Sequence, residues 1–305
     1  MKRVLVTGAN GHLGNNLVRL LLEEGYNVRA SVRDLGDPKK TGPLEGLGVS
    51  LVEADILKPE TLPAAVEGRD GVFHLAAAYL TWAKDPQRDI IDPSLKGAEN
   101  VLGAAADAGV RKVVLTSSCV AVGLDATPED PLTEADWNDD AVNPYAIAKT
   151  EAERLAWVLA EERGLALVTV NPTGIIGPGF YRHTPSTLAY EKEDAAGRYI
   201  CSTQYCRLLD LVEVIRGLRP DLALPRKQLP AAVLPVLAAL DWVAHKVTGR
   251  PRTMTRDMLQ EFLGKHQHVS SAKLRALGWS PMDFETTVED TLQWTEKTFL
   301  EATGA

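Results

Sequence analysis

The stretch "RVLVTGANGHLG" (residues 3–14) joins a short apolar run to a glycine turn and to the start of a helical pattern. Gly8, Gly11 and Gly14 lie in this turn with GxxGxxG spacing, one residue wider than the GxGxxG fingerprint. Such a turn lets the backbone approach a pyrophosphate, and the N-terminus of the following helix supplies amide donors. A tight turn without a ligand is the alternative. The stretch predicts that the chain opens with a dinucleotide-binding unit.

The same alternation of short apolar runs and helical patterns continues along the chain. Runs this short and continuously apolar suit strands that are buried on both faces. Strand, helix, strand order predicts an α/β Rossmann fold, a doubly wound parallel sheet. Past Val170 the alternation fails, so we expect a dinucleotide domain over residues 1–175 and a smaller C-terminal substrate-binding lobe over 176–305, with 198–202 as a candidate return to the sheet. The predicted strands are residues 3–7, 26–32, 49–54, 71–76, 112–117 and 165–170.

Composition excludes several classes of protein. A net charge of -8 over 305 residues argues against binding to nucleic acid, which needs clustered Lys and Arg. The three cysteines form no CxxC pair, which fits a reducing compartment and indicates no metal site. The N-terminus lacks a signal-peptide pattern, so we expect a cytoplasmic protein. The most apolar segment, residues 229–247, is interrupted by Pro235, Asp241, His245 and Lys246, so we expect a helix of the lobe and no membrane span; membrane-surface contact is the alternative.

The stretch "NPYAIAK" (residues 143–149) places a tyrosine and a lysine four residues apart. Asn143 can cap a helix and Pro144 fits its first turn, so Tyr145 and Lys149 should lie one turn apart on the same face. A tyrosine that exchanges protons near neutrality needs roughly 4 kcal/mol of phenolate stabilisation. A lysine charge at roughly 5 Å supplies about 3 kcal/mol. The pair is therefore a candidate acid/base couple.

The residues after the second predicted strand bear on the choice of dinucleotide. A carboxylate there usually binds the ribose hydroxyls of NAD, whereas a basic side chain accommodates the 2'-phosphate of NADP. Arg33, together with Lys39 or Lys40, favours NADP, because an arginine can bind a phosphate with two hydrogen bonds. Asp34 keeps NAD as the less favoured alternative.

Several motifs along nearly the whole chain resemble one family. They are "TGANGHLG", "EADIL", "VFHLAAA", "VVLTSS", "YAIAK", "NPTGIIGPG" and "VSSAKLRALGWSP", in this order. In these motifs the chain resembles the extended short-chain dehydrogenase/reductase family. The stretches "VRASVRD", "LTSSCVAVG" and "GRYICS" are most similar to its dihydroflavonol reductase and cinnamoyl-CoA reductase branch.

The resemblance assigns roles to individual residues. It implies that Tyr145 is the acid/base, that Lys149 tunes it and that Ser118 binds the substrate oxygen, with Ser117 as the alternative. The ring of His74 is not expected to be catalytic. The cofactor residues, from the glycine turn, the basic residues and the resemblance together, are Gly8, Asn10, Gly11, His12, Leu13, Gly14, Arg33, Lys40, Asp55, Ile56, Leu75, Ala76, Ala77, Pro172, Thr173 and Gly174.

The resemblance also implies an activity. An NADPH-dependent reductase of this branch acts on a carbonyl group, a ketone or an aldehyde, of a small organic, phenolic or isoprenoid-like molecule. Gly123 stands where the plant enzymes have a polar residue that orients the flavonoid, which argues against a flavonoid. The alternatives are a nucleotide-sugar epimerase or dehydratase, which Gly174 disfavours because it replaces an asparagine, and a non-catalytic dinucleotide sensor. Relatives are often dimers, so a homodimer is expected.

The link between "NPTGIIGPG" and "AAGRYIC" is short for this family, with only residues 180–194 between them. A crossover between parallel strands usually needs a dozen residues or more. We therefore expect that a pocket loop between Thr184 and Leu188 is missing from the sequence as given, which would show as one long step between neighbouring Cα atoms there.

Overall fold

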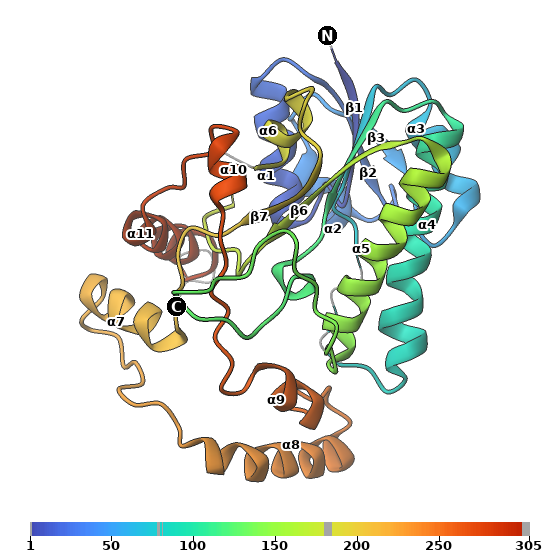
Figure 1. The fold of residues 1–305 in the computed structure, drawn as a ribbon. Coiled ribbons are helices and arrows are strands. Elements are labelled where there is room, and N and C mark those ends of the chain that lie inside the picture. Colours follow the sequence, from blue (N-terminus) through green and yellow to red (C-terminus); the bar gives the residue numbers. More distant parts are fainter. Residues whose placement is uncertain (1, 78–79, 81, 180–184, 301–305) are drawn as a thin grey trace.

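The computed structural model describes residues 2–77, 80, 82–179 and 185–300 (Figure 1). Its centre is a seven-stranded sheet in the order β3-β2-β1-β4-β5-β6-β7, in which every neighbouring pair is parallel. The predicted α/β Rossmann fold is confirmed. The strands are β1 (Arg3–Thr7), β2 (Asn27–Val32), β3 (Ser50–Glu53), β4 (Gly71–His74), β5 (Lys112–Thr116), β6 (Ala166–Pro172) and β7 (Gly197–Cys201).

Helices cover both faces of the sheet. On one face α1, α6 and α10 pack against the strands, and on the other α3, α4 and α5 do so. The helices are α1 (His12–Glu23), α2 (Pro38–Thr41), α3 (Leu62–Val66), α4 (Asp92–Asp107), α5 (Pro144–Arg163), α6 (Pro185–Glu191), α7 (Leu208–Leu218), α8 (Leu234–Thr248), α9 (Arg256–Phe262), α10 (Ala272–Ala276) and α11 (Phe284–Thr295). Short 3₁₀ or π turns are η1 (Gly42–Leu44), η2 (Pro59–Thr61), η3 (Gln87–Ile91), η4 (Cys119–Ala121), η5 (Ala231–Val233) and η6 (Glu296–Leu300).

The burial of the central strand β1 on both faces explains why its sequence is apolar at Val4, Leu5 and Val6. Side chains alternate across a strand, so Val4 and Val6 enter the core on the α1 side while Leu5 enters the core on the α4 side. All three side chains are fully buried. A sheet covered on both faces thus needs the continuous apolar runs seen in the sequence.

The strand order changes direction between β1 and β4. The chain moves outward from β1 to β2 and β3, then returns across β1 to β4 and continues to β7. At such a switch point the loops after neighbouring strands diverge and leave a crevice at the carboxyl ends of the strands. The glycine turn after β1 and the segment after β4 border this crevice.

The second half of the chain extends past the carboxyl ends of the strands, where α7, α8 and α9 lie apart from the sheet (Figure 1). The chain first returns to the sheet through β7, which pairs with β6. The division into residues 1–175 and 176–305 stays a prediction, although β7 shows that the sheet draws on both parts.

The short link before β7 contains α6. Residues 185–188 form a continuous part of this helix, so the expected break does not occur between them. The step that precedes Pro185 lies outside the described residues.

One segment of the described chain, Ala231–Thr248, has the length and apolar composition that a bilayer-crossing helix requires. It comprises η5 and α8 in the outlying part of the molecule. A single helix that passes this test is weak evidence for a span. The expected absence of a membrane span therefore stays a prediction.

Candidate active site

The glycine turn after β1 holds its shape through close backbone contacts. Gly8 has a φ of 67°, and a Cβ atom there would lie 2.9 Å from the Ala76 backbone nitrogen. A Cβ on Gly14 would lie 2.1 Å from the Gly8 carbonyl oxygen, so this glycine lets α1 pack onto the turn. Gly11 precedes α1, and within the described chain no side chain caps that helix. The amides of its first turn are available to a phosphate ligand.

A cavity of about 480 Å³ opens beside this turn. It lies at the switch point between β1 and β4, where a dinucleotide is expected to bind. Nine of the predicted cofactor residues line it: Gly8, Asn10, Gly11, Arg33, Asp55, Ile56, Leu75, Ala76 and Ala77.

The charged residues after β2 are placed differently from one another. Arg33 is exposed and lines the cavity. Asp34 accepts a hydrogen bond from the Gly36 amide at 2.8 Å and does not line the cavity. Lys40 belongs to α2, which Asp37 caps, and it also lies outside the cavity lining. Of the residues weighed for the choice between NAD and NADP, the structure brings only Arg33 to the cavity.

A second cavity, of about 930 Å³, contains the predicted catalytic residues. Ser118 follows β5, and Tyr145 and Lys149 lie one turn apart on α5; all three line this cavity. The two cavities share Leu75 and Ala77. Five more of the predicted cofactor residues line the second cavity: His12 and Leu13 from the glycine turn, and Pro172, Thr173 and Gly174, which the resemblance places at the cofactor.

The N-terminus of α5 is built as the sequence predicts. The Asn143 side chain accepts a hydrogen bond from the Tyr145 amide at 3.0 Å, and Pro144 occupies the first turn. Asn143 is itself buried. The cap therefore fixes where α5 begins and, with it, the position of Tyr145 in the cavity wall.

Two opposing effects set the charge of Lys149. The half-buried lysine is surrounded by protein, which lowers its pKa to about 8, while the carboxylate of Glu153 acts in the opposite direction. Glu153 lies one helical turn further along α5. Lys149 is therefore mostly protonated at pH 7, as the stabilisation of a tyrosinate requires.

Glu153 is the centre of a buried polar network that sequence reasoning missed. Its carboxylate accepts hydrogen bonds from Ser117 Oγ at 2.6 Å, Thr169 Oγ1 at 2.8 Å, Asn171 Nδ2 at 2.7 Å and Arg198 Nε at 2.8 Å. With these four donors the buried charge is well satisfied. Glu153 follows Lys149 at the same spacing of four residues at which Lys149 follows Tyr145, and this repeat is the signal in the sequence that could have revealed the network.

Arg198 on β7 completes this network. Its guanidinium lies 3.7 Å from the centroid of the Trp137 ring and donates to the carbonyl oxygens of Glu134, Asp136 and Ala121. These contacts join β7 to the loop between β5 and α5. The network thus fixes the position of the loop between β5 and α5, which forms part of the cavity wall.

The network also separates the two serine candidates. Ser117 Oγ is turned toward Glu153 and donates to it. Ser118 Oγ accepts a hydrogen bond from the Val120 amide at 3.3 Å, which leaves its own O–H able to donate. This arrangement favours Ser118 for contact with a substrate oxygen.

His74 at the end of β4 is a structural residue in a defined tautomer. Thr7 Oγ1 accepts from the amides of Leu75 and Ala76, both at 3.1 Å, so its proton points to His74 Nδ1 at 2.8 Å. Nδ1 is then an acceptor and the ring is neutral. Burial lowers the pKa of His74 to about 3, with the charge of Lys149 contributing in the same direction.

The neutral ring of His74 should make the fold sensitive to acid. Its folded pKa of about 3 is below the ordinary 6.5, so its contribution to stability is complete above pH 6.5 and is lost as the pH falls. At pH 5 the loss should be about 2 kcal/mol. Urea unfolding at pH 7 and pH 5 measures it, with His74→Gln as the comparison. If the wild type and His74→Gln lose the same free energy of unfolding between pH 7 and pH 5, the prediction is wrong, because the His74 ring then takes up a proton without unfolding the protein.

A second buried carboxylate connects the outlying helices to the catalytic helix. Glu261 on α9 is fully buried and accepts from the amides of Val142 and Asn143 at 2.6 and 2.8 Å. Asp257, also on α9, accepts from Asn143 Nδ2 at 2.9 Å. The same helix contributes Met258 and Phe262 to the wall of the second cavity. The residues that shape the pocket are therefore tied to the cap of α5.

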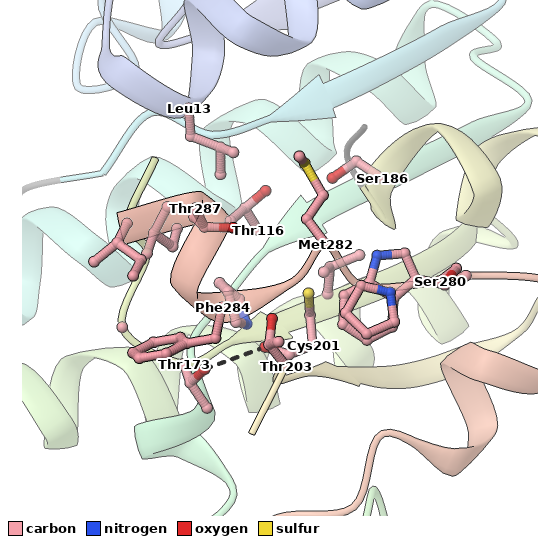
Figure 2. A pocket seen from close by; sticks show the side chains of 17 residues that line it. Leu13, Thr116, Thr173, Ser186, Cys201, Thr203, Ser280, Met282, Phe284 and Thr287 are labelled. Atoms are coloured by element: carbon pink, nitrogen blue, oxygen red, sulfur yellow. Dashed lines mark hydrogen bonds between the residues drawn. The ribbon is translucent and has the colours of Figure 1, made fainter. Parts of the chain in front are cut away.

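A smaller cavity of about 180 Å³ lies against the segment after β6 (Figure 2). Figure 2 shows Thr173, whose Oγ1 donates to the Cys201 carbonyl oxygen at 3.4 Å, and Phe284 and Thr287 of α11. Thr116 at the end of β5 lines this cavity and the catalytic one, and its buried hydroxyl has no hydrogen-bond partner among the described residues. An unpaired buried hydroxyl at this place fits a polar group of a bound cofactor or substrate.

Sequence reasoning missed the far wall of the catalytic cavity. Met258, Phe262, Lys265 and Gln267 line it, although they are more than a hundred residues from Tyr145. Among the described residues, no group of three or more His, Cys, Asp or Glu side chains is placed to bind a metal ion.

Comparison with known proteins agrees with this geometry. The family model described as the NAD dependent epimerase/dehydratase family matches residues 4–194. Cinnamoyl-CoA reductase CAD2 of Medicago truncatula is 34% identical over 270 residues, which cover 73% of this chain and 83% of that protein. Dihydroflavonol 4-reductase of Zea mays is 32% identical over 272 residues, or 73% and 76% of the two chains. The structure of yeast methylglyoxal/isovaleraldehyde reductase Gre2 complexed with NADPH superposes with a TM-score of 0.76 at 21% identity, over 98% and 99% of the chains.

Proposed function

Because the chain belongs to the extended short-chain dehydrogenase/reductase family, within the branch of the dihydroflavonol and cinnamoyl-CoA reductases, we propose that it reduces a carbonyl group of a small molecule with NADPH. The protein is an oxidoreductase that acts on C=O or CH–OH groups. A ketone or aldehyde of a phenolic or isoprenoid-like compound is the substrate class we favour, because the catalytic cavity has aliphatic and aromatic walls, including Val120, Leu124, Met258 and Phe262.

The residues of the cavity can carry out the proton half of this reaction. NADPH, when bound, supplies the hydride to the carbonyl carbon. Ser118 donates a hydrogen bond to the carbonyl oxygen, and Tyr145 transfers its phenolic proton to that oxygen, so that C=O becomes CH–OH. The charge of Lys149 stabilises the resulting tyrosinate, and Glu153 keeps Lys149 protonated.

One observation carries this proposal. Ser118, Tyr145 and Lys149 come from two elements, and all of them line one cavity that continues into the dinucleotide cavity. A non-catalytic sensor would need the dinucleotide cavity alone and would have no use for the hydroxyls of Ser118 and Tyr145. Gly174 in place of an asparagine disfavours the epimerase alternative.

A panel of ketones, aldehydes and sugar nucleotides tests the proposed function. We expect loss of the reduced-cofactor absorbance with apolar ketones or aldehydes, at rates well above the rate without substrate. Sugar nucleotides should give neither oxidation nor epimerised product. Turnover of a sugar nucleotide without net oxidation of the cofactor would identify an epimerase and refute the reductase.

Arg33 is expected to select NADPH over NADH. An arginine–phosphate contact is typically worth about 1.5 to 3 kcal/mol, so Arg33→Ala should weaken NADPH binding tenfold or more and leave NADH binding nearly unchanged. Calorimetric titration of both cofactors measures this. Lys40→Ala is the matched control, with a smaller effect because Lys40 lies outside the cavity lining. Equal dissociation constants for the two cofactors in the wild-type protein would contradict the preference.

Two further proposals concern the location and the assembly of the protein. A cytoplasmic location agrees with the free thiols of Cys119, Cys201 and Cys206. A homodimer is proposed on the resemblance alone, and sedimentation velocity tests it.

A further inference from the structure

An apolar stripe runs along the outer side of α8, the element farthest from the sheet in Figure 1. Its residues recur at spacings of three and four, so they share one side of the helix. Each is exposed, from 37% for Val233 to 79% for Val247. Single exposed aliphatic residues are common, whereas a continuous row marks an interaction surface. The apolar stripe consists of Val233, Val236, Leu240, Val243 and Val247.

The opposite side of α8 already has its partners. Asp241 accepts hydrogen bonds from Arg252 Nε at 3.2 Å and from the Met254 amide at 3.3 Å. The ring of His245 lies 4.9 Å from that of Trp82. Through these contacts α8 is attached to the protein by its inner side, and the apolar stripe points away from the attachment.

An apolar groove also borders α8, although none of the stripe residues lines it. It has a volume of about 700 Å³ and lies between α8 and α9. Trp242, which is 49% exposed, stands in this groove. Aliphatic and proline side chains make up most of its remaining wall: Pro235, Ala238, Ala239, Leu259 and Leu263.

The charge around the stripe is opposite to that of the whole chain. Between residues 221 and 257 there are six basic and three acidic residues, a net charge of +3, although the net charge of the chain is -8. Arg226 and Lys227 precede the stripe, Lys246 lies beside its last residue, Arg250 follows it, and all four are exposed. Two of the acidic residues, Asp241 and Asp257, accept hydrogen bonds on the inner side, from Arg252 and from Asn143. The stripe is therefore bordered at both ends by cationic side chains.

We propose that α8 docks this protein on the surface of an anionic lipid bilayer. Aliphatic side chains bind acyl chains without any need for hydrogen bonds, and basic residues at the ends of the helix meet the anionic headgroups. Two copies that paired stripe to stripe would instead bring their basic ends together, since basic residues outnumber acidic ones six to three over residues 221–257. Charge complementarity thus favours lipid over a second copy.

The inner contacts of α8 decide its orientation on the bilayer. Asp241 bonds Arg252 and Met254 in the segment before α9, and His245 contacts Trp82, so α8 is held by its inner side, lies in the interface and does not cross it. On α9, Leu259 and Leu263 face the groove while Met258 and Phe262 line the catalytic cavity. Helix α9 therefore lies between the groove and the catalytic cavity, an arrangement that suits an apolar substrate that is dissolved in lipid.

Vesicle flotation tests this proposal. The full-length protein is mixed with vesicles of phosphatidylcholine alone or of phosphatidylcholine with phosphatidylglycerol. We expect binding to the mixed vesicles at least about tenfold stronger than to the neutral ones at low salt, and weaker binding as salt is added. Absence of binding to the mixed vesicles at low salt would overturn the proposal.

Variants separate the two parts of the surface. Leu240→Ser with Val243→Ser should abolish binding to both kinds of vesicle, and Arg226→Gln with Lys227→Gln should weaken binding to the anionic vesicles by about twentyfold. Val158→Ser is the matched control, because Val158 is 50% exposed on α5; it should bind like the wild type. All replaced side chains are exposed, so melting temperatures should agree. A wild-type dimer that becomes a monomer in the Leu240→Ser, Val243→Ser protein would show that a second copy covers the stripe and would refute lipid docking.

Discussion

Tyr145→Phe should lower the rate of carbonyl reduction by about a thousandfold, within the range of 10²–10⁴ that a positioned acid/base typically contributes. The phenolic hydroxyl is the group that donates to the carbonyl oxygen, and phenylalanine keeps the ring while it removes that proton. Single-turnover rates with NADPH measure the loss, and titration of the cofactor should give an unchanged dissociation constant. A variant that turns over at the wild-type rate would end the assignment of Tyr145.

Tyr26→Phe is the matched control for this experiment. The Tyr26 hydroxyl donates to Glu191 at 3.0 Å on the far face of the sheet, and Tyr26 lines neither the dinucleotide cavity nor the catalytic cavity. Its removal should cost about 1 kcal/mol of stability and leave turnover unchanged. A loss of activity in both variants would point to a general effect on folding.

Glu153→Gln should have the largest effect on stability, about 3 to 5 kcal/mol, because it leaves Arg198 as a buried charge without its partner. The side chains of Glu153 and Arg198 are 0% and 6% exposed. A glutamine would also place an amide NH₂ group, which is itself a donor, among the side-chain donors that bind the carboxylate oxygens of Glu153 in the wild type. Such a cost is a large part of the 5–15 kcal/mol that typically stabilises a folded protein, and urea unfolding measures it.

The same variant should shift the pH dependence of turnover. The Glu153 carboxylate raises the pKa of Lys149, so its removal lowers that pKa further below about 8. The alkaline limb of the pH–rate profile should then move to lower pH. An unshifted limb would show that Glu153 has a purely structural role.

Two further proteins make this experiment decisive. Glu151→Gln, the same change at an exposed position of α5, should alter stability by less than about 1 kcal/mol. The double variant Glu153→Gln, Arg198→Met removes both buried charges and should recover much of the lost stability while it keeps the shifted pH limb. If Glu153→Gln alone fails to fold, the double variant still measures the effect on Lys149.

The parts of the fold that sequence could predict depend on local spacing. The glycine turn follows from the close approach of Gly8 to Ala76 and of Gly14 to Gly8, which no other residue type permits. The relative placement of Tyr145 and Lys149 follows from the helical period and from the Asn143 cap. Buried strands such as β1 are recognisable because both of their faces are covered. In each case the signal lies in a short run of sequence, even where the contact that explains it, such as that of Gly8 with Ala76, is with a distant residue.

The parts that could not be predicted depend on contacts between distant segments. Glu153 meets Ser117, Thr169 and Arg198 only because β5, β6 and β7 lie side by side with α5 across them. Lys40 appeared as suitable as Arg33 in the sequence, but the α2 turn leaves it outside the cavity lining. No local pattern connects Met258 or Gln267 to Tyr145, since their shared cavity arises from the path of the outlying helices.

The buried Glu261 sets a condition on any attempt to replace the predicted C-terminal lobe with that of a homologue. Chimeras that exchange substrate lobes between homologues are a common route to new specificity. Here the carboxylate of α9 receives the two backbone amides immediately before the catalytic helix, so a grafted lobe must bring a carboxylate to the same place. A graft without it would leave those amides unpaired and loosen the start of α5. Engineering of the pocket is therefore better done by single replacements at Met258 or Phe262, which keep this connection intact.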